Sequence, residues 1–155
     1  MRLLFKQRLF SWFDSYDIYN EANETVFTVY GRMGWGHRLE VQDRSGRAIG
    51  MLEEKIFRFW PTFEMYVHGN YIGAIRKEYT FFKPTFEIDV NGWRIEGDWW
   101  EWDYTIVDNL GLTVATISKQ LGWTDTYVLD VYNDSDVLSV LMVVLAIDAE
   151  KCSRD

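Results

Sequence analysis

One long apolar run, residues 137–147 (VLSVLMVVLAI), constrains the fold more than any other part of this sequence. Because the run is apolar on every side, with Ser139 as its one hydroxyl, a helix built from it could not lie half in water as an amphipathic surface helix does. At about 1.5 Å of rise per residue it reaches only roughly 16 Å, about half of what the hydrocarbon core of a bilayer requires. The run is therefore expected to be surrounded by protein.

The amino-acid composition favours strands around this run. The chain has 155 residues, which suits one domain spanning 1–155 with a sizeable core. Hydrophobic residues make up 48% and aromatic residues 17%, and aromatic side chains favour the pleated, half-buried surface of a sheet. Since only 2 Pro interrupt the chain, a mainly β fold is predicted.

Charge and cysteine content narrow the possible partners. A net charge of −8 argues against nucleic acid and against general attraction to anionic membranes, because both need a basic footprint. The one cysteine, Cys152, excludes an internal disulfide, and the charged start MRLLFKQR lacks the apolar core of a secretory signal. We expect a cytoplasmic monomer without cofactor or transmembrane span, and leave open a peripheral position at the membrane.

Alternating residues predict strands from the N-terminus onward. Leu3 and Phe5 fall on one face of an extended segment, whereas Arg2 and Lys6 fall on the other. An interfacial membrane helix is the alternative, but the basic residues would not gather on one side of it. Hairpins then follow, because clusters of Asn, Asp and Gly typical of turns recur along the chain. These clusters are residues 20–23, 43–46, 67–70, 91–92 and 108–111.

Two internal repeats support an antiparallel sheet. Residues 59–67 recur as residues 82–90, displaced by 23 positions, and both copies contain Pro-Thr-Phe-Glu. The proline suits the entrance of a strand, because it has a fixed φ and no N–H to donate. A second pair, residues 43–53 and 108–118, is displaced by 65 positions.

The number of strands links the sheet to the apolar run. About twelve strand-like segments lie between Arg2 and Tyr132. A barrel of about eight strands is filled by its own side chains, whereas a wider one needs something in its lumen. We therefore predict a closed antiparallel barrel around a central helix at about 134–149, with residues 134–136 capping its first turn. A buried last strand is the alternative for the run.

Several motifs resemble the LURP-one-related family, which belongs with Tubby C-terminal domains and phospholipid scramblases. They are KQRLFS at 6–11, YDIYN at 16–20, PTFE at 61–64, VATI at 114–117 and the apolar C-terminal run. The resemblance implies a barrel of about twelve strands around a hydrophobic C-terminal helix. Because its motifs are structural, it implies an activity only loosely, as binding of a phospholipid head group or a protein partner.

Basic residues are candidates for contacts to a phosphoinositide or another anionic lipid. Lys6 and Arg8 share one strand face, and Arg76, Lys77 and Lys83 form a second local concentration. The alternative is that these side chains are solubilising partners of the many carboxylates.

An acidic and aromatic block at 93–104 is the other candidate. Alternation points Trp93, Ile95, Trp100, Trp102 and Tyr104 inward and the charged residues outward. The outward carboxylates could bind a cation such as Ca²⁺ or act on a sugar stacked on an aromatic ring. The residues of this candidate site are Glu96, Asp98, Trp99, Glu101 and Asp103. The alternative is a solvated surface, where nothing raises a carboxyl pKa.

The search for catalytic or metal-binding constellations otherwise finds little. His37 and His68 show no zinc spacing with Cys152, and both are expected on the surface. Residues 31–36 are rich in glycine but follow no βαβ unit, so they are expected to form a hairpin bend. A binding protein without enzymatic activity is predicted, and a carbohydrate-binding or carbohydrate-active barrel is the alternative.

Overall fold

A computed structural model describes residues 1–6, 15–32, 37–57, 60–79, 84–123 and 125–152. For residues 56–57, 60–61, 77–79, 84–86 and 152 it describes the backbone alone.

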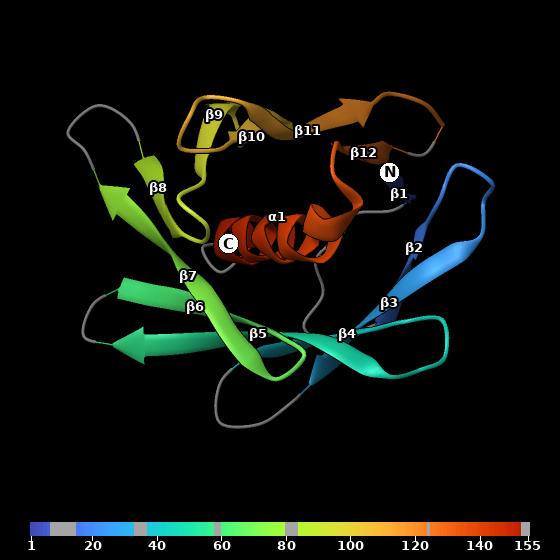
Figure 1. Cartoon of the computed structure of the whole chain (residues 1–155), viewed down its shortest axis with the longest axis horizontal. Coiled ribbons are helices and arrows are strands. Elements are labelled where there is room, and N and C mark those ends of the chain that lie inside the picture. Colours follow the sequence, from blue (N-terminus) through green and yellow to red (C-terminus); the bar gives the residue numbers. More distant parts are fainter. Residues whose placement is uncertain (7–14, 33–36, 58–59, 80–83, 124, 153–155) are drawn as a thin grey trace.

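Twelve strands precede one helix in this part of the chain, as the strand-like segments predicted (Figure 1). The strands are β1 Arg2–Phe5, β2 Ser15–Tyr19, β3 Thr25–Arg32, β4 Arg38–Gln42, β5 Ala48–Phe57, β6 Trp60–Val67, β7 Asn70–Tyr79, β8 Pro84–Asp89, β9 Arg94–Asp98, β10 Asp103–Val107, β11 Thr113–Gln120 and β12 Thr126–Val131. A 3-10 turn, η1 Asp134–Asp136, leads into the helix α1 Val137–Cys152.

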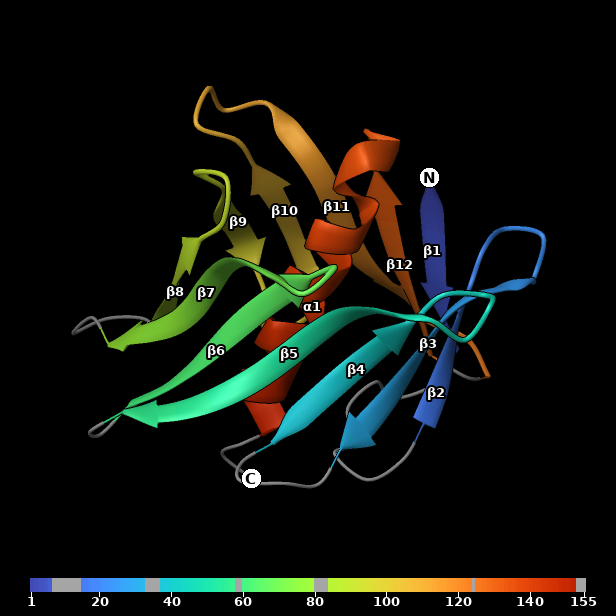
Figure 2. The same cartoon turned by 60° about the horizontal axis from the view of Figure 1, so that its bottom comes forward.

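The strands form one antiparallel sheet that curls into a nearly closed barrel (Figures 1 and 2). Its order is β8-β7-β6-β5-β4-β3-β2-β1-β12-β11-β10-β9, so nearly all neighbours are consecutive in the sequence. The exception is β1, which pairs with β12 and places Leu3 opposite Leu129. This one long-range pairing joins the two ends of the strand region and turns a meander into a barrel.

The apolar run lies inside the barrel as a helix, which confirms the central prediction. Every side chain from Val140 to Ala146 is 0% exposed. Met142 packs against Gly50 of β5, where a Cβ would lie only 2.9 Å from the methionine sulfur. The helix continues to Cys152, past the expected end at 149, so that Lys151 lies in its last turn instead of beyond it. In the described part of the chain, no helix is long and apolar enough to cross a membrane.

Two turns of the same structure account for the repeat of residues 43–53 at 108–118. The Oδ1 atom of Asp43 accepts the N–H groups of Ser45 at 2.9 Å and Arg47 at 3.0 Å. The Oδ1 atom of Asp108 accepts the N–H groups of Leu110 and Leu112, both at 2.9 Å. Three positions after each aspartate stands a glycine at positive φ, Gly46 in the first turn and Gly111 in the second. The displacement of 65 positions therefore repeats one turn structure before β5 and before β11.

A tyrosine on the barrel wall gives a test of this geometry at high pH. The hydroxyl of Tyr66 donates a hydrogen bond to the Glu64 carboxylate at 2.7 Å. This hydrogen bond is the larger cause, and burial the next, that raises the pKa of Tyr66 from 10.0 to about 12. The neutral form is favoured in the folded state, so this contribution to stability is complete below pH 10.0 and is lost as pH rises towards about 12. We expect NMR titration of labelled tyrosine to show this late ionisation, and Glu64→Gln to shift it back towards 10.0. An unchanged Tyr66 titration in that variant would contradict the assignment.

Candidate functional site

Lys6 and Arg76, the two residues predicted to contact lipid whose side chains the structure describes, are not brought together. Lys6 directly follows β1, whereas Arg76 lies in β7, and five strands separate β1 from β7 in the sheet order. Arg8 and Lys83 lie outside the described residues, and Lys77 is described only as a backbone position of β7. Lys6 and Arg76 therefore belong to separate surfaces.

Local partners neutralise most of the described basic side chains. Lys6 donates to the Asn23 side chain and lies 4.7 Å from the centre of the Tyr19 ring. Arg76 is exposed and stands opposite Glu87 in the ladder of β7 and β8. Other ion pairs join Arg32 to Glu40, Arg38 and Lys55 to Glu53, Arg44 to Glu24, Arg47 to Asp43, and Lys119 to Asp125. An anionic head group would have to compete with these carboxylates.

The predicted acidic site lies on the hairpin of β9 and β10. Glu96, Asp98, Glu101 and Asp103 are all exposed, as the alternation predicted. Asp98 stands opposite Asp103, and its Oδ1 accepts two backbone N–H groups of the following turn at 3.1 Å. Glu96 forms an ion pair with Arg94 at 3.1 Å. Two of the four carboxylates thus have local structural roles.

The expected inward position of Trp100 is wrong. Trp100 is 53% exposed, whereas Trp99 is half-buried, packs against the core and meets Trp100 edge to face at 5.5 Å. The alternation fails because β9 ends at Asp98, and Trp102 then takes a positive φ of 60° in the turn. The ring best placed to stack on a sugar is therefore Trp100, not Trp99.

The predicted surface histidines differ in their surroundings. His68 is exposed at a positive φ of 50° in the turn between β6 and β7. The Nδ1 atom of His37 lies 2.5 Å from Oε2 of Glu54, whose side chain is 7% exposed. Within the described ranges no group of three or more His, Cys, Asp or Glu residues could hold a metal ion. Residues 33–36 of the expected hairpin bend lie outside the described residues, and residues 31–32 belong to β3.

Charged groups inside the barrel at the end of α1 were missed by sequence reasoning. Asp148, Glu150 and Lys151 are 6%, 2% and 9% exposed. Lys151 donates to the backbone oxygen of Trp100 at 3.2 Å. Burial raises the pKa of Tyr104 well above its ordinary value, and the charge of Asp148 raises it further. The available signal was the DAEK sequence at 148–151, which directly continues the apolar run.

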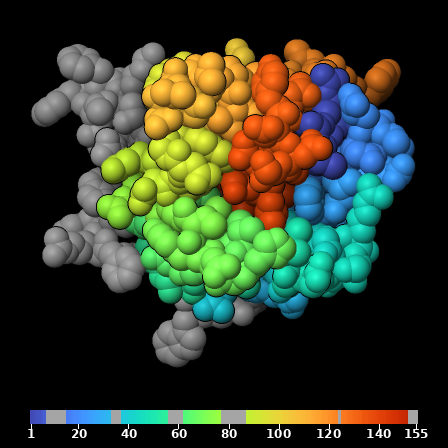
Figure 3. Space-filling model, viewed as in Figure 1, coloured from blue at the N-terminus to red at the C-terminus, as the bar shows by residue number. Residues whose placement is uncertain are grey.

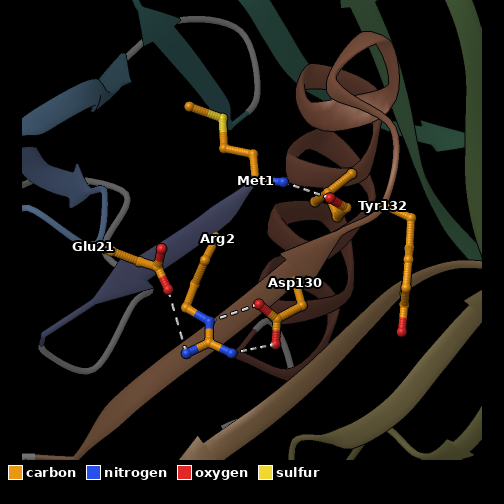
Figure 4. A pocket seen from close by; sticks show the side chains of 6 residues that line it. Met1, Arg2, Glu21, Asp130 and Tyr132 are labelled. Carbon is orange, nitrogen blue, oxygen red and sulfur yellow. Dashed lines mark hydrogen bonds and ion pairs between the residues drawn. The ribbon is translucent and has the colours of Figure 1, made fainter.

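A cavity of about 420 Å³ opens beside the N-terminal strand (Figure 4). Its lining residues are Met1, Arg2, Glu21, Asp130, Val131 and Tyr132. Arg2 binds Asp130 through two hydrogen bonds of 2.7 and 3.2 Å, and its Nη1 lies 3.5 Å from Glu21. The hydrogen bond to Asp130 and the charge of that carboxylate raise the pKa of Arg2. Two carboxylates, Glu21 and Asp130, and two cations, the Arg2 guanidinium and the N-terminal ammonium of Met1, line the cavity. The ammonium lies 3.6 Å from Asp134.

Exposed apolar side chains surround this end of the barrel, and we call them the apolar rim. The rim comprises Met1, Leu110, Leu112 and Tyr132, which are 48%, 81%, 63% and 69% exposed. The N–H of Tyr132 donates to the carbonyl of Val114 at 3.1 Å. Because Val114 comes two residues after Leu112, this bond holds Tyr132 near the turn that carries the two leucines. Figure 3 shows the gold turn between β10 and β11, the orange-red start of the helix and the dark blue N-terminal strand on one face.

A second group of exposed apolar side chains lies at the opposite end of the barrel. Leu121 and Trp123, in the turn between β11 and β12, are 85% and 107% exposed. No alternation predicted either group, because the residues of both lie outside the strands.

A nearly closed sheet around an apolar C-terminal helix defines the class of this protein. The chain belongs to the LURP-one-related family, whose sequence profile matches residues 1–148. The uncharacterized protein YxjI of Bacillus subtilis (strain 168) is 30% identical over 149 residues, which cover 96% of this chain and 92% of that protein. An Arabidopsis thaliana protein with an X-ray structure has a TM-score of 0.63 at 14% identity, covering 93% of this chain and 88% of its own. At that identity the likeness is one of fold.

Proposed function

We propose that this barrel is a non-enzymatic binding module whose partner is another protein. The observation that supports this function is the apolar rim beside a cavity in which the side chain of Glu21 is 68% exposed. Leucine and tyrosine side chains left in water contribute little to folding, and clustered exposed apolar side chains are typical of contact surfaces. The partner would present an apolar segment together with a basic side chain.

The cavity suits the basic side chain of such a partner. Its volume of about 420 Å³ falls in the range of about 300 to 1,000 Å³ that is usual for specific sites. Arg2 is already bound to Asp130, whereas Glu21 lies 3.5 Å from Arg2 with a side chain that is 68% exposed. A lysine or arginine of the partner could therefore approach Glu21 without breaking the pair of Arg2 and Asp130.

Two other functions have weaker support. The likeness to Tubby domains and scramblases favours an anionic lipid head group, but the local pairing of the basic side chains opposes it. Exposed Trp100 favours a sugar, but Asp98 serves its turn and Glu96 binds Arg94. A hydrolase activity abolished by Glu101→Gln would contradict the non-enzymatic proposal.

The double variant Leu110→Ser with Leu112→Ser should lose its protein partner while remaining folded. Both side chains are exposed on a turn fixed by backbone bonds to Asp108, so their loss removes contact area and leaves the core intact. We expect capture of the partner to fall by at least about tenfold, since central apolar contacts dominate binding energy. Cross-linking with quantitative mass spectrometry would measure it, and circular dichroism would check the fold.

The matched control is Leu121→Ser with Trp123→Ser, a similar loss of apolar area at the other end of the barrel. It should retain the partner. Loss in the control alone would contradict the assignment to the apolar rim. Lipid binding is tested separately by flotation with vesicles that contain phosphatidylserine or a phosphoinositide. Strong flotation of the protein with these vesicles would favour the lipid function instead.

A further inference from the structure

The barrel wall stays open between β8 and β9. These strands are consecutive in the sequence, yet they form the two ends of the sheet order. Among the described strands, β8 pairs only with β7 and β9 pairs only with β10. We call the region between their free edges the seam. An edge strand presents unpaired N–H and C=O groups, which act as a template for another strand.

The turn between them fixes the seam at one end. Val90 and Trp93 are 1% and 6% exposed, and the N–H of Trp93 bonds to the carbonyl of Val90 at 2.9 Å. Asn91 and Gly92 supply the positive φ values that this tight turn needs. The ladder does not continue from this turn, although such turns commonly start a hairpin.

An inward row of isoleucines is incomplete at the seam. In β7 and β8, Ile75 stands opposite Ile88, and in β10 and β9, Ile106 stands opposite Ile95. The two inner members, Ile75 and Ile106, are 1% and 0% exposed. The two members that border the seam, Ile88 and Ile95, are only half-buried. Apolar side chains entering between them would complete the row.

The outward side chains along the seam are mostly acidic. Glu87 and Asp89 of β8 are exposed, as are Glu96 and Asp98 of β9. Arg94 is the basic residue of β9, and it pairs with Glu96 at 3.1 Å. Charged residues commonly protect sheet edges against pairing, but charges of mostly one sign protect only against neutral and acidic strands. A second copy of this chain would bring the same carboxylates and be repelled.

We propose that the seam binds an extended segment of a partner protein as an additional strand, with apolar and basic side chains in alternation. Its backbone would pair with the free edges of β8 and β9, in the mode of strand addition. Its apolar side chains would join the isoleucine row, and its lysines or arginines would face the outward carboxylates. The proposal rests on the proposed function in that the partner is a protein, but it uses a surface other than the apolar rim.

A labelled nine-residue peptide of alternating lysine and valine is the probe. We expect saturable binding by fluorescence anisotropy and slower hydrogen exchange of backbone amides in β8 and β9. A glutamate and valine peptide should not bind. The lysine and valine peptide methylated on alternate backbone nitrogens keeps the charge but loses half of its donors, so it should bind at least about tenfold more weakly, or about 1.4 kcal/mol.

Charge-reversal variants then locate the site. Asp89→Lys with Glu96→Lys should weaken binding at least about tenfold, because both positions border the seam. The control, Asp17→Lys with Glu24→Lys, makes the same charge change at exposed positions in β2 and directly before β3. Equal weakening in both, equal binding of the methylated peptide, or absence of binding would overturn the proposal. If capture through the apolar rim persists in that case, the protein-binding function stands without the seam.

Discussion

Replacing Leu141 by Asp, or Val144 by Lys, is expected to give unfolded or insoluble protein. Both side chains are 0% exposed inside the barrel, so the new charge would be buried without a partner. Such burial costs several kcal/mol even after relaxation, which is comparable with the roughly 5 to 15 kcal/mol of stability of a whole domain. Thermal unfolding followed by circular dichroism and the yield of soluble protein would measure the effect.

Leu138→Asp provides the matched control on the same helix. Leu138 is half-buried, so a carboxylate there can reach water, and it lies in the first turn, where the helix dipole favours negative charge. We expect this variant to fold. Folding of Leu141→Asp with a melting temperature close to that of the control would contradict a filled lumen.

Gly73→Ala should be the most disruptive small substitution in the sheet. Gly73 in β7 has a φ of +149°, and a Cβ there would lie 1.7 Å from the backbone oxygen of Asp89 in β8. The backbone conformation is one that essentially only glycine adopts, and the clash is with main chain that cannot rotate away. We expect the free energy of unfolding to fall by on the order of 3 kcal/mol or more, measured by urea denaturation.

Gly69→Ala separates the strain of positive φ from the clash. Gly69 also has a positive φ, +78°, but nothing lies within 4 Å of its Cβ position. This variant should lose only about 1 to 2 kcal/mol, the cost of a left-handed residue. Equal losses at Gly69 and Gly73 would show that the close approach of β8 to β7 is absent.

Local patterns predicted the architecture because each element has its own signal in the sequence. Alternation identified the strands, Asp43 and Asp108 marked equivalent turns, and an apolar run too short for a bilayer indicated a filled lumen. The limits of the helix were less accurate, since it was expected at about 134–149 and spans Val137–Cys152. The barrel tolerates the acidic residues 148 and 150 because the end of the helix remains enclosed.

The candidate binding surfaces could not be predicted in the same way, because they depend on long-range pairing. Arg2 and Asp130 are 128 positions apart and meet only because β1 pairs with β12. The seam likewise depends on two consecutive strands failing to pair, although the turn between them is typical of a hairpin. Alternation also failed at Trp100, because this residue lies in the turn between β9 and β10 and not in a strand.

The central structural claim is that the apolar C-terminal run forms the inside of the barrel and is not a separate tail. The most direct measurement is near-UV circular dichroism during thermal unfolding of a chain truncated after Asn133. Without the helix the lumen loses the side chains that fill it, so we expect an insoluble product or one without tryptophan dichroism and without a cooperative transition. A truncated protein that stays monomeric, unfolds cooperatively and keeps its near-UV signal would contradict this account.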